Sequence, residues 1–412
     1  MAQINFTLNQ EEILQLLSED NNEAFRKLLE SSLNSVLKAE SQEQLQAAPY
    51  ERTEERTDSR NGFRDRELKT RIGTITLHVP RHRNQPFQTM VFENYSRSEA
   101  ALIVCMAEMV VNGVSTRKVS KVMETLCGTS YSKSTVSEVC KRLDKDVEAF
   151  RNRPLDGKYP FLTVDATYFK VRENHRIVSK AFMIALAVNE EGQREIIGFG
   201  VYPCESIETW KDFLSALRKR GLKEVLMITS DAHEGLINAL GEVYPGVPWQ
   251  RCQFHFTRNI SEKMPKRYQA GIRAELHEMF NAETLEGARK IRDRIIADYH
   301  DVSESAMECL EMGFESSMTV MTLPKNYRRH FRTSNNIERL NEELKRRSNA
   351  IRIFSNQASL VRLMGSVLIE QNSAYQSGRR FFSAESYQAL KNGDIRVKLK
   401  KIAMEQQALL AA

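Results

Sequence analysis

The 412-residue chain has few cysteines, and they are not paired. Cysteine occupies six scattered positions with no C-x-x-C spacing, whereas disulfide frameworks and zinc ribbons need such pairs. Long hydrophobic runs are also missing: none reaches the roughly 18 residues that a membrane span requires, and no secretory leader is visible at the N-terminus. These absences exclude disulfide-rich secreted scaffolds and membrane proteins, and they predict a reduced, cytoplasmic protein.

Positive charge is in slight excess and unevenly distributed. The net charge of +6 permits nucleic-acid binding without proving it. Acidic residues dominate the first fifty positions, whereas Lys and Arg concentrate in residues 52–83 and 325–352. This asymmetry predicts a DNA-facing surface assembled from separate segments. The length allows several domains, each with its own hydrophobic core.

The first two predicted domains differ in their periodicity. Residues 1–46 follow a helical pattern and form a helical region of unassigned role. Residues 47–96 form a basic segment with short strands, in which Asn61–Gly62 is predicted to be a turn and apolar residues alternate from Ile72 to Val79. The arginine fork suits phosphates and base edges, although interspersed acids leave a solvated, salt-bridged surface as the alternative. The predicted DNA contacts in this segment are Arg52, Arg56, Arg60, Arg64, Lys69, Arg71 and Arg81.

Three helices are predicted in residues 97–155. The first ends at Asn112–Gly113, the second ends at Gly128, and the third begins near Ser132 and continues to Phe150. This layout is typical of a helix-turn-helix domain, in which the N-terminal residues of the recognition helix contact base edges. A plain three-helix bundle is the alternative that the pattern leaves open. The residues predicted to contact DNA here are Lys133, Ser134 and Thr135.

An α/β block occupies residues 156–255. Its strands and amphipathic helices alternate in the order β-β-β-α-β-α-β, and a late helix at 333–353 follows. This order is that of the ribonuclease-H-like fold. Residues 256–332 are mostly helical and too long for a loop, so they are predicted to be an inserted subdomain, and residues 354–412 to be C-terminal helices. The predicted fold class is an α+β multidomain protein: a ribonuclease-H-like core with an α-helical insertion, preceded by helical and helix-turn-helix DNA-binding domains.

Three acidic residues are candidates for a catalytic site. Asp165 lies inside the apolar strand TVDATY, where a carboxylate is costly unless it is paired or binds a metal. Asp231 ends the apolar strand VLMITSD, although it could instead cap the helix that follows. Glu338 lies on the helix of TSNNIERLNEELKRR, capped by Asn335 or Asn336, where an ion pair with a basic neighbour is the alternative.

These acids have the chemistry of a divalent-cation site. Two Asp and one Glu supply the oxygen ligands that Mg²⁺, or Mn²⁺ in its place, prefers. Two such ions together promote in-line phosphoryl transfer. Asn341 shares a helical face with Glu338 and could support a ligand, while Lys345, Arg346 and Arg347 would hold the DNA backbone.

Four segments carry a signature that is specific in combination. They are YERTEERTDSRNGFRDRELKTRIGTITLHVPR, FLTVDATYFKVRE, WQRCQFHFTRNI and TSNNIERLNEELKRR. They closely resemble the IS256 family of bacterial insertion-sequence transposases, which is related to the eukaryotic Mutator elements. The resemblance implies a DDE transposase whose ribonuclease-H-like domain is interrupted by a helical insertion between the second Asp and the Glu. It assigns catalysis and metal binding to Asp165, Asp231 and Glu338.

The resemblance also implies an activity and partners. Such a protein binds the double-stranded terminal inverted repeats of its element, cleaves one strand and transfers the freed 3′-hydroxyl to another phosphodiester. It implies a homodimer or larger assembly that also engages target DNA, in the bacterial cytoplasm at the nucleoid. A catalytically inactive DNA-binding regulator and a metal-dependent nuclease without strand transfer are the alternatives. The intact acids argue against the regulator, and the basic DNA-binding segments argue against the nuclease.

The family's C-x-x-H motif falls on Cys252 and His255. A structural zinc site wants four ligands, and no second pair has the right spacing. We therefore interpret the two residues as structural or adjacent to the active site, with a zinc site as the alternative. Trp210 or Trp249 could stack on an unpaired base at a DNA end, but a buried aromatic is the alternative for both.

Overall fold

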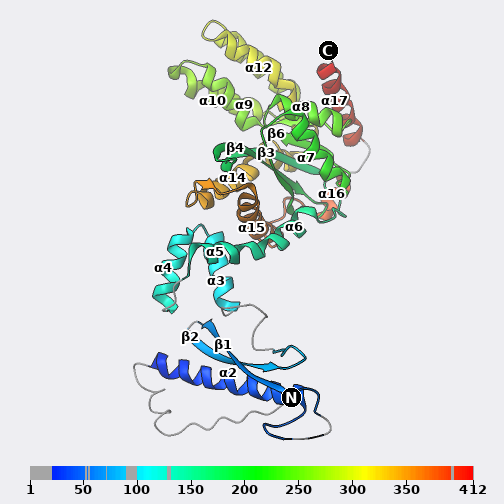
Figure 1. Cartoon of the computed structure of the whole chain (residues 1–412). Helices are drawn as coiled ribbons and strands as arrows, with labels where there is room; N and C mark the ends of the chain where they lie inside the picture. Colours follow the sequence, from blue (N-terminus) through cyan, green and yellow to red (C-terminus); the bar gives the residue numbers. More distant parts are fainter. Residues whose placement is uncertain are drawn as a thin grey trace. The chain divides into compact units, whose positions relative to one another are not determined.

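The computed structural model describes residues 21–51, 53, 56–70, 72–89, 100–127, 131–390 and 394–411. The chain divides into two compact units, of which the first ends at Arg142 and the second begins at Leu143 (Figure 1). The predicted helical domain at 97–155 spans this boundary. Arg52, Arg71 and the predicted helical residues before Asn21 lie outside the described residues.

The first unit contains a long helix packed against a β-hairpin. Helix α2 (Asn21–Leu45) contributes Leu37 to a core that it shares with strands β1 (Arg60–Thr70) and β2 (Gly73–His82). Alternate residues of the antiparallel hairpin face this core, as the period of a half-buried strand requires. The hairpin side chains in the core are Leu68, Ile75, Leu77 and Val79.

The predicted turn at Asn61–Gly62 is wrong. The two strands are joined between Thr70 and Gly73, and Asn61–Gly62 lie inside β1, where the pairing register shifts between Arg60 and Phe63. Gly62 has a φ of +74°. One type of β-bulge places a Gly at positive φ, as tight hairpin turns also do, so an Asn–Gly dipeptide is compatible with either structure.

Asp58 joins the segment before the hairpin to the segment after it. Its carboxylate accepts hydrogen bonds from the backbone N–H groups of Gln85, Asn84 and Ser59 at 2.9, 2.9 and 2.6 Å. These backbone donors stabilise the charged carboxylate and lower the pKa of Asp58 from 3.8 to about 2. The carboxylate therefore stabilises the first unit only while it is ionised.

We expect Asp58→Asn to increase hydrogen exchange at the amides of Asn84 and Gln85 at pH 7. Because the folded pKa lies below the unfolded one, the stabilisation is complete above about pH 4 and is lost as the pH falls through about 2. The difference in amide exchange between parent and variant, measured by hydrogen-exchange mass spectrometry, should therefore become smaller as the pH falls over that range. A difference that persists undiminished near pH 2 would show that the ionised carboxylate is not its cause.

Three short helices form a second core in the first unit. They are α3 (Ala100–Val111), α4 (Thr116–Cys127) and α5 (Lys133–Cys140), and Met106, Val119 and Val136 are fully buried among them. The hydroxyl of Ser132 accepts the N–H of Thr135 at 3.0 Å and so caps α5.

The predicted third helix is in fact two helices. A 3₁₀ turn at Lys141–Leu143 separates α5 from α6 (Asp144–Asn152). The physical reason is that the two halves bury their apolar residues in different cores. Val139 packs with α3 and α4, whereas Val147 packs against Gly365 of the second unit.

The second unit is built on a mixed sheet in the order β5-β4-β3-β6-β7, with a short strand β8 paired to β3. Strands β3, β4 and β5 are antiparallel neighbours, and β6 and β7 run parallel to β3. The order β-β-β-α-β-α-β along the chain agrees with the sequence-based expectation. The bounds are β3 (Phe161–Glu173), β4 (Arg176–Val188), β5 (Arg194–Tyr202), β6 (Met227–Ser230), β7 (Trp249–Arg251) and β8 (Ile353–Phe354).

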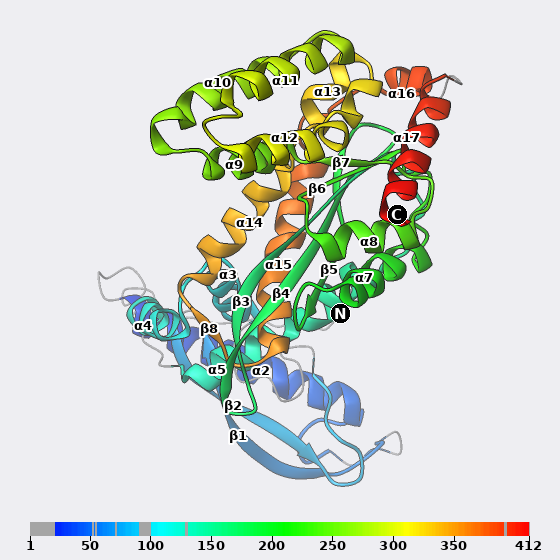
Figure 2. The ribbon, with the colours of Figure 1, turned by 90° about the horizontal axis from the view of Figure 1, so that it is seen from above.

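Helices cover both faces of this sheet. Helices α7 (Ile207–Lys219) and α8 (Glu234–Val243) pack on one face, where Leu162 and Val164 of β3 join their core (Figure 2). Helices α14 (Asn335–Ser348) and α15 (Gln357–Gln376) lie along the other face. Because both faces are covered, residues 181–188 of β4 are all buried, which explains their continuous apolar run.

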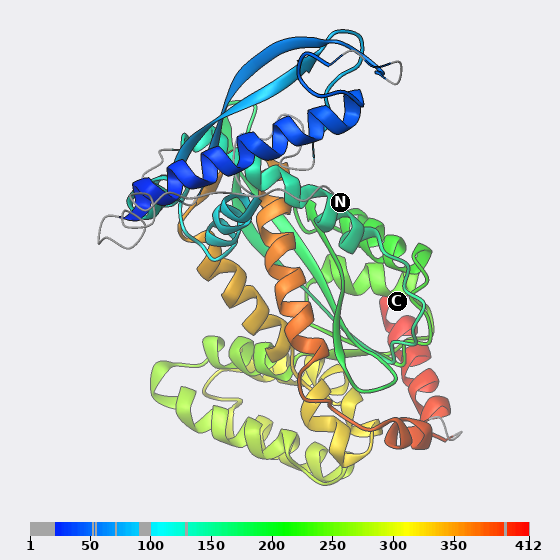
Figure 3. The same cartoon turned by 90° about the horizontal axis from the view of Figure 1, so that it is seen from below.

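The predicted helical insertion is a helical layer with its own core. Phe256, Leu276, Leu310 and Phe314 are among its buried residues. Figure 3 shows this layer, in yellow-green, beyond one end of the sheet, with α15 in orange along the sheet. Its elements are α9 (Gln253–Lys263), η2 (Lys266–Tyr268), α10 (Gln269–Phe280), α11 (Leu285–Tyr299), α12 (Glu304–Ser317), η3 (Thr319–Thr322) and α13 (Lys325–Phe331).

The C-terminal helices are α16 (Ala384–Leu390) and α17 (Asp394–Ala411). From α17, the side-chain amide of Gln406 reaches the last strand of the sheet. Its Oε1 accepts the backbone N–H of Trp249, and its Nε2 donates to the carbonyl oxygen of Trp249, both at 2.8 Å. Among the described residues, no helix is both long and apolar enough to cross a membrane.

Candidate active site

The sheet register places Asp165 and Asp231 side by side. Strands β3 and β6 are parallel, and Thr163 is paired with Thr229. Asp165 and Asp231 each lie two residues beyond this pair, so the two acids reach the same level of adjacent strands. Asp165 is within β3, and Asp231 follows the last residue of β6.

The environment of Asp165 disfavours its charged form. Burial and the negative charge of Asp231 raise the pKa of Asp165 to about 7, while the backbone N–H of Ala166 and the charge of His255 oppose them. The amide of Asn341, from α14, donates to Asp165 Oδ2 at 2.6 Å. The two acids are therefore close enough to repel one another, and a cation would relieve that repulsion.

Hydrogen bonds attach the segment before α14 to the ends of the central strands. Thr229 of β6 donates from Oγ1 to the carbonyl oxygen of Phe331 at 2.9 Å. The backbone N–H of Gln253 donates to the carbonyl oxygen of Arg332 at 3.0 Å. The ring of Phe331 also stacks on that of Phe161 in β3, with 3.7 Å between their centroids. This segment therefore delivers Glu338, in the first turns of α14, to the edge where Asp165 and Asp231 lie.

Ser334 holds the Glu338 carboxylate in place. It is buried and donates from Oγ to Glu338 Oε1 at 2.7 Å. Its backbone N–H donates to Cys252 Sγ at 3.3 Å, and its Oγ lies 3.1 Å from the same sulfur. The predicted cap by Asn335 or Asn336 is wrong, because α14 begins at Asn335 and Ser334 occupies the N-cap position without capping the helix.

His255 lies between the two groups of acids. Its Nε2 is 3.7 Å from Glu338 Oε1. A hydrogen bond with Cys252 is the largest cause that raises the pKa of His255 to about 9, and the charges of Glu338 and Asp165 add to it. The acids thus form two groups, Asp165 with Asp231 and Glu338 with His255, and His255 interacts with both.

The C-x-x-H motif is therefore part of the candidate active site. Cys252, His255 and Glu338 place one potential ligand atom each within 4.8 Å of one another. That makes three potential ligands, where a structural zinc site wants four. The C-x-x-H motif also has a structural role, because the contacts between Cys252 and Ser334 fix the start of α14.

The donor set fits a hard divalent cation. Beside Asp165 and Asp231, Asn341 offers a buried side-chain oxygen, Oδ1, to which no described residue donates a hydrogen bond. Carboxylate and amide oxygens are the ligands that Mg²⁺ prefers, usually together with water. A buried oxygen without a donor is costly, so a ligand supplied from outside the chain would stabilise this arrangement.

The sequence model of the family described as "Transposase, Mutator family" matches residues 1–378. The chain belongs to this family. It is similar to the transposase of IS256 in transposon Tn4001 from Staphylococcus aureus, with 41% identity over 93% of this chain and 99% of that protein. It is similar to the ISRM5 transposase of Rhizobium meliloti, with 37% identity over 94% and 95% of the two chains. The predicted membership of the IS256 family, related to Mutator elements, is confirmed.

In this Mutator-family chain, several predicted DNA contacts surround a hollow of the first unit. Arg56, Arg60 and Arg81 line it together with Tyr50 and Phe63, and its volume is about 570 Å³. Arg56 donates to the carbonyl oxygen of Asp58 at 2.9 Å and Arg60 to that of Ala47 at 2.6 Å, so both guanidinium groups are held in defined positions.

The other predicted DNA contacts differ in exposure. Arg64 is exposed on β1 and Lys69 is half-buried. Lys133, Ser134 and Thr135 are exposed in the first turn of α5, the position from which a recognition helix contacts bases. Lys345 and Arg346 are exposed near the end of α14. Trp210 and Trp249 are both buried, in agreement with the buried-aromatic alternative.

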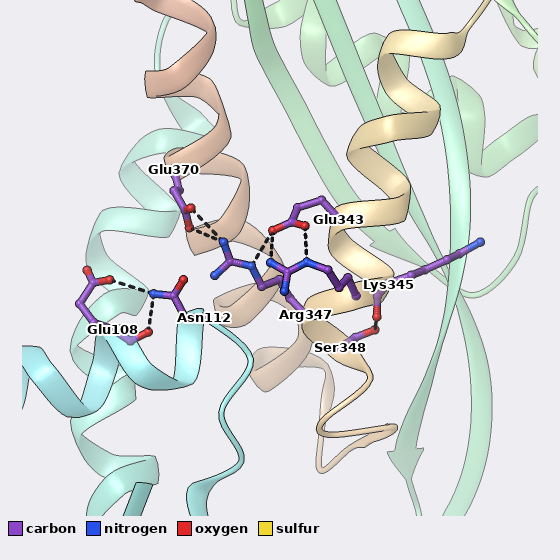
Figure 4. A network of polar contacts seen from close by, with 8 residues as sticks. Glu108, Asn112, Glu343, Lys345, Arg347, Ser348 and Glu370 are labelled. Carbon is purple, nitrogen blue, oxygen red and sulfur yellow. Dashed lines mark hydrogen bonds and ion pairs between the residues drawn. The ribbon is translucent and has the colours of Figure 1, made fainter. Parts of the chain in front are cut away.

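Arg347 differs from its two basic neighbours because it is buried. Its Nε donates to Glu343 at 2.6 Å, and its Nη2 donates to Glu370 of α15 at 2.9 Å (Figure 4). Hydrogen bonds from Arg346 first, and then from Arg347, lower the pKa of Glu343 to about 2. These contacts join α14 to α15 and fit a structural role for Arg347 better than a DNA contact.

We expect Arg347→Ala to destabilise the second unit and Arg346→Ala to leave its stability nearly unchanged. Removing one partner of a buried ion pair costs several kcal/mol, but Glu370 is partly exposed, so about 2 kcal/mol is expected here. The side chain of Arg346 is 62% exposed and should contribute to DNA affinity instead. Thermal unfolding and a DNA-binding titration of both variants separate the two roles. Equal stability of the two variants would contradict this assignment.

Proposed function

We propose that this chain is a DDE transposase that binds the terminal inverted repeats of its insertion sequence and catalyses metal-dependent strand cleavage and strand transfer. The observation that carries the proposal is the register that puts Asp165 and Asp231 at the same level of β3 and β6. His255 supports it, because its charge acts on Asp165 and its Nε2 lies 3.7 Å from Glu338 Oε1. The sheet order, with helices on both faces and a helical layer between α8 and α14, supports a ribonuclease-H-like core with an insertion.

Asp165, Asp231 and Glu338 would hold Mg²⁺ or Mn²⁺, as the pair of ions that in phosphoryl-transfer enzymes activates the attacking oxygen and stabilises the leaving oxygen. Other side chains of the protein orient these carboxylates. Asn341 orients the Asp165 carboxylate, and Ser334 orients that of Glu338. His255 Nε2 lies 3.7 Å from Glu338 Oε1 and adds to the positioning of that carboxylate.

The proposed reaction consists of two displacements at phosphorus. In the first, a water oxygen forms a bond to phosphorus and the 3′-oxygen leaves, which frees a 3′-hydroxyl. In the second, that hydroxyl attacks another phosphodiester, so that one P–O bond forms as another breaks. Neither step needs a covalent link between protein and DNA. Positioning and neutralisation of phosphate charge are the main contributions of the site, and Lys345 and Arg346 are placed to supply part of that charge.

We propose that DNA ends are recognised by the first unit. The basic hollow and the exposed start of α5, in a helix-turn-helix layout, are its two candidate surfaces. Because two ends of one element must be joined, two copies of the chain would act together as a homodimer. The ends and the target would be double-stranded DNA, so the protein would act at the bacterial nucleoid.

The proposal is tested with purified protein, Mg²⁺ and a labelled duplex that carries the element's end. The parent should nick the duplex at the end and form a joined product, and Asp231→Asn and Glu338→Gln should do neither. Nicking without joining would support the nuclease alternative. End-specific binding with no cleavage by the parent would support the regulator alternative.

Removing the positive charges of the arginines that line the hollow should weaken DNA binding and reduce its dependence on salt. We expect the triple variant Arg56→Gln, Arg60→Gln, Arg81→Gln to reduce the slope of log affinity against log salt by about 3, because each lost phosphate contact releases about one counterion fewer. Lys290→Gln, at an exposed lysine of α11, is the control. A triple variant with the salt dependence of the parent would remove the hollow from the DNA interface.

A further inference from the structure

Three segments that are far apart in the sequence meet around the ring of Phe381. This ring stacks on that of His330, near the end of α13, with 4.6 Å between their centroids. The guanidinium carbon of Arg194, at the start of β5, lies 5.3 Å from the centroid of the same ring. The backbone N–H of Phe381 donates to the carbonyl oxygen of Gly192 at 2.8 Å. The end of α13, the turn before β5 and the chain after α15 therefore form one surface of the second unit.

This surface carries three arginines without acidic partners. Arg329 directly precedes His330, Arg379 lies two residues before Phe381, and both are exposed. Within the described ranges, neither of them forms an ion pair or a side-chain hydrogen bond, and Arg194 forms no ion pair. We call Arg194, Arg329 and Arg379 the α13 patch.

Aromatic rings, and not carboxylates, hold the innermost arginine of the patch. The guanidinium carbon of Arg194 lies 4.3 Å from the centroid of the Tyr375 ring, on the side of α15. Its Nε is buried and has no acceptor among the described residues. A guanidinium group stacked on aromatic faces is fixed in position and keeps its charge.

The positive charges of the patch are not balanced by the chain. Arg380, beside Arg379, is paired with Glu191 at 3.7 Å, so an acid was within reach of this segment, yet Arg379 has none. Burial lowers the pKa of His330, and the charges of Arg329 and Arg379 lower it further. Neighbouring positive charges repel one another, and an anion from outside the chain would relieve that repulsion.

The α13 patch lies near the candidate active site. Phe331, the residue after His330, stacks on Phe161 at 3.7 Å. Phe161 begins β3 four residues before Asp165, which is about 13 Å along a strand. DNA rises roughly 3.4 Å per base pair, so a duplex whose backbone reaches both places would span about four base pairs between them.

Arg339 continues the positive charge toward the acids. It directly follows Glu338 on α14, is exposed, and forms no ion pair with any residue that the structure describes. Burial raises the pKa of Tyr375, and the charges of Arg194 and Arg339 oppose this. One positive surface thus runs from the α13 patch past Tyr375 to the helix that carries Glu338.

We propose that the α13 patch binds the phosphate backbone of double-stranded DNA about four base pairs from the phosphate that is cleaved. The guanidinium fork matches the spacing of phosphate oxygens. The inference rests on the proposed function, since it presupposes that the acids act on DNA. It gives the second unit a DNA contact of its own, separate from the surfaces of the first unit that recognise the ends.

The salt dependence of DNA binding by the full chain tests this contact. We expect the double variant Arg329→Gln, Arg379→Gln to reduce the slope of log affinity against log salt by about 2, because two phosphate contacts are lost. The double variant Arg329→Lys, Arg379→Lys keeps the charges and should keep most of the slope. The matched control replaces Arg289 and Arg294 by Gln, since these exposed arginines of α11 are already paired with acids.

Neutral methylphosphonate linkages locate the contact along the DNA. Placed one at a time in the end duplex, they should weaken binding of the parent about four base pairs from the cleaved phosphate. The same linkages should have little effect on the double Gln variant, because its contact there is already lost. Linkage effects of equal size in parent and variant at every position would overturn the inference.

The remaining outcomes separate the inference from the proposed function. A parental salt slope in the double Gln variant removes the patch from the DNA interface, while nicking and joining by the parent leave the proposed function standing. If the parent neither nicks nor joins, the proposed function fails, and a reduced slope still supports DNA binding by the patch. If the variant loses affinity for poly-glutamate but not for DNA, the patch serves an acidic protein and the inference is overturned.

The single variants Arg329→Gln and Arg379→Gln decide the question if the double variant does not fold. Each should reduce the slope by about 1. A parental slope in both would contradict the inference.

Discussion

Replacing Asp165 by Asn is expected to reduce strand cleavage by on the order of 10³-fold, the size of effect seen when one electrostatic contributor to a transition state is removed. The substitution keeps the shape of the side chain and removes its charge at the point where Asp231 lies beside it. It should reduce cleavage and joining equally, because the proposed mechanism uses the same site for both. Gel analysis of a labelled end duplex measures both products.

The same variant should fold at least as stably as the parent in the absence of metal. Burial and Asp231 raise the pKa of Asp165 to about 7, so the charged side chain costs the folded state free energy that Asn avoids. Asp156→Asn, at an exposed position before β3, is the control and should cleave like the parent. Activity of Asp165→Asn within tenfold of the parent would remove Asp165 from the catalytic set.

Ser334→Ala should lower the cleavage rate by about 10- to 100-fold, as expected for the loss of a group that orients a metal ligand. The hydroxyl donates to Glu338 Oε1, whereas the contact with Cys252 also uses the backbone N–H, which the variant retains. DNA affinity should not change. Single-turnover cleavage at saturating DNA isolates the effect on the chemical step.

Two further variants show whether this effect is specific. Ser334→Thr keeps the hydroxyl and should recover most of the rate. Ser348→Ala removes another buried hydroxyl of α14, one that donates to the carbonyl oxygen of Lys345 at 2.9 Å, and should have no effect on the rate. If Ser334→Thr were as slow as Ser334→Ala, packing around Cys252 rather than the hydroxyl would be the cause.

The positions of the acids could be anticipated because their signal is local. An ionisable residue inside an apolar strand, such as Asp165, conflicts with its own neighbours and so attracts attention. The alternation of strands and amphipathic helices is likewise contained in short windows of sequence. These local patterns were sufficient to predict the order of elements around the site and the helical layer after His255.

Other features depend on partners that are distant in sequence. Arg347 has the same local charge pattern as Arg346, but α15 buries it through Glu370, and nothing near position 347 reveals that. Asn61–Gly62 supplies a positive φ, and only the length of the paired strands decides between a turn and a bulge.

The side-chain amide of Gln406 bonds both the N–H and the carbonyl oxygen of Trp249. It thus takes the place that the backbone of a neighbouring strand would occupy. A terminal strand offers unpaired backbone groups on which another polypeptide can assemble, and here a side chain occupies them. Loss of the last eighteen-residue helix would leave the backbone N–H of Trp249 without this acceptor, while Thr319 Oγ1 would still donate to the Trp249 carbonyl oxygen at 2.9 Å. Helix α17 therefore covers part of the edge of the sheet and lowers its tendency to pair with another chain.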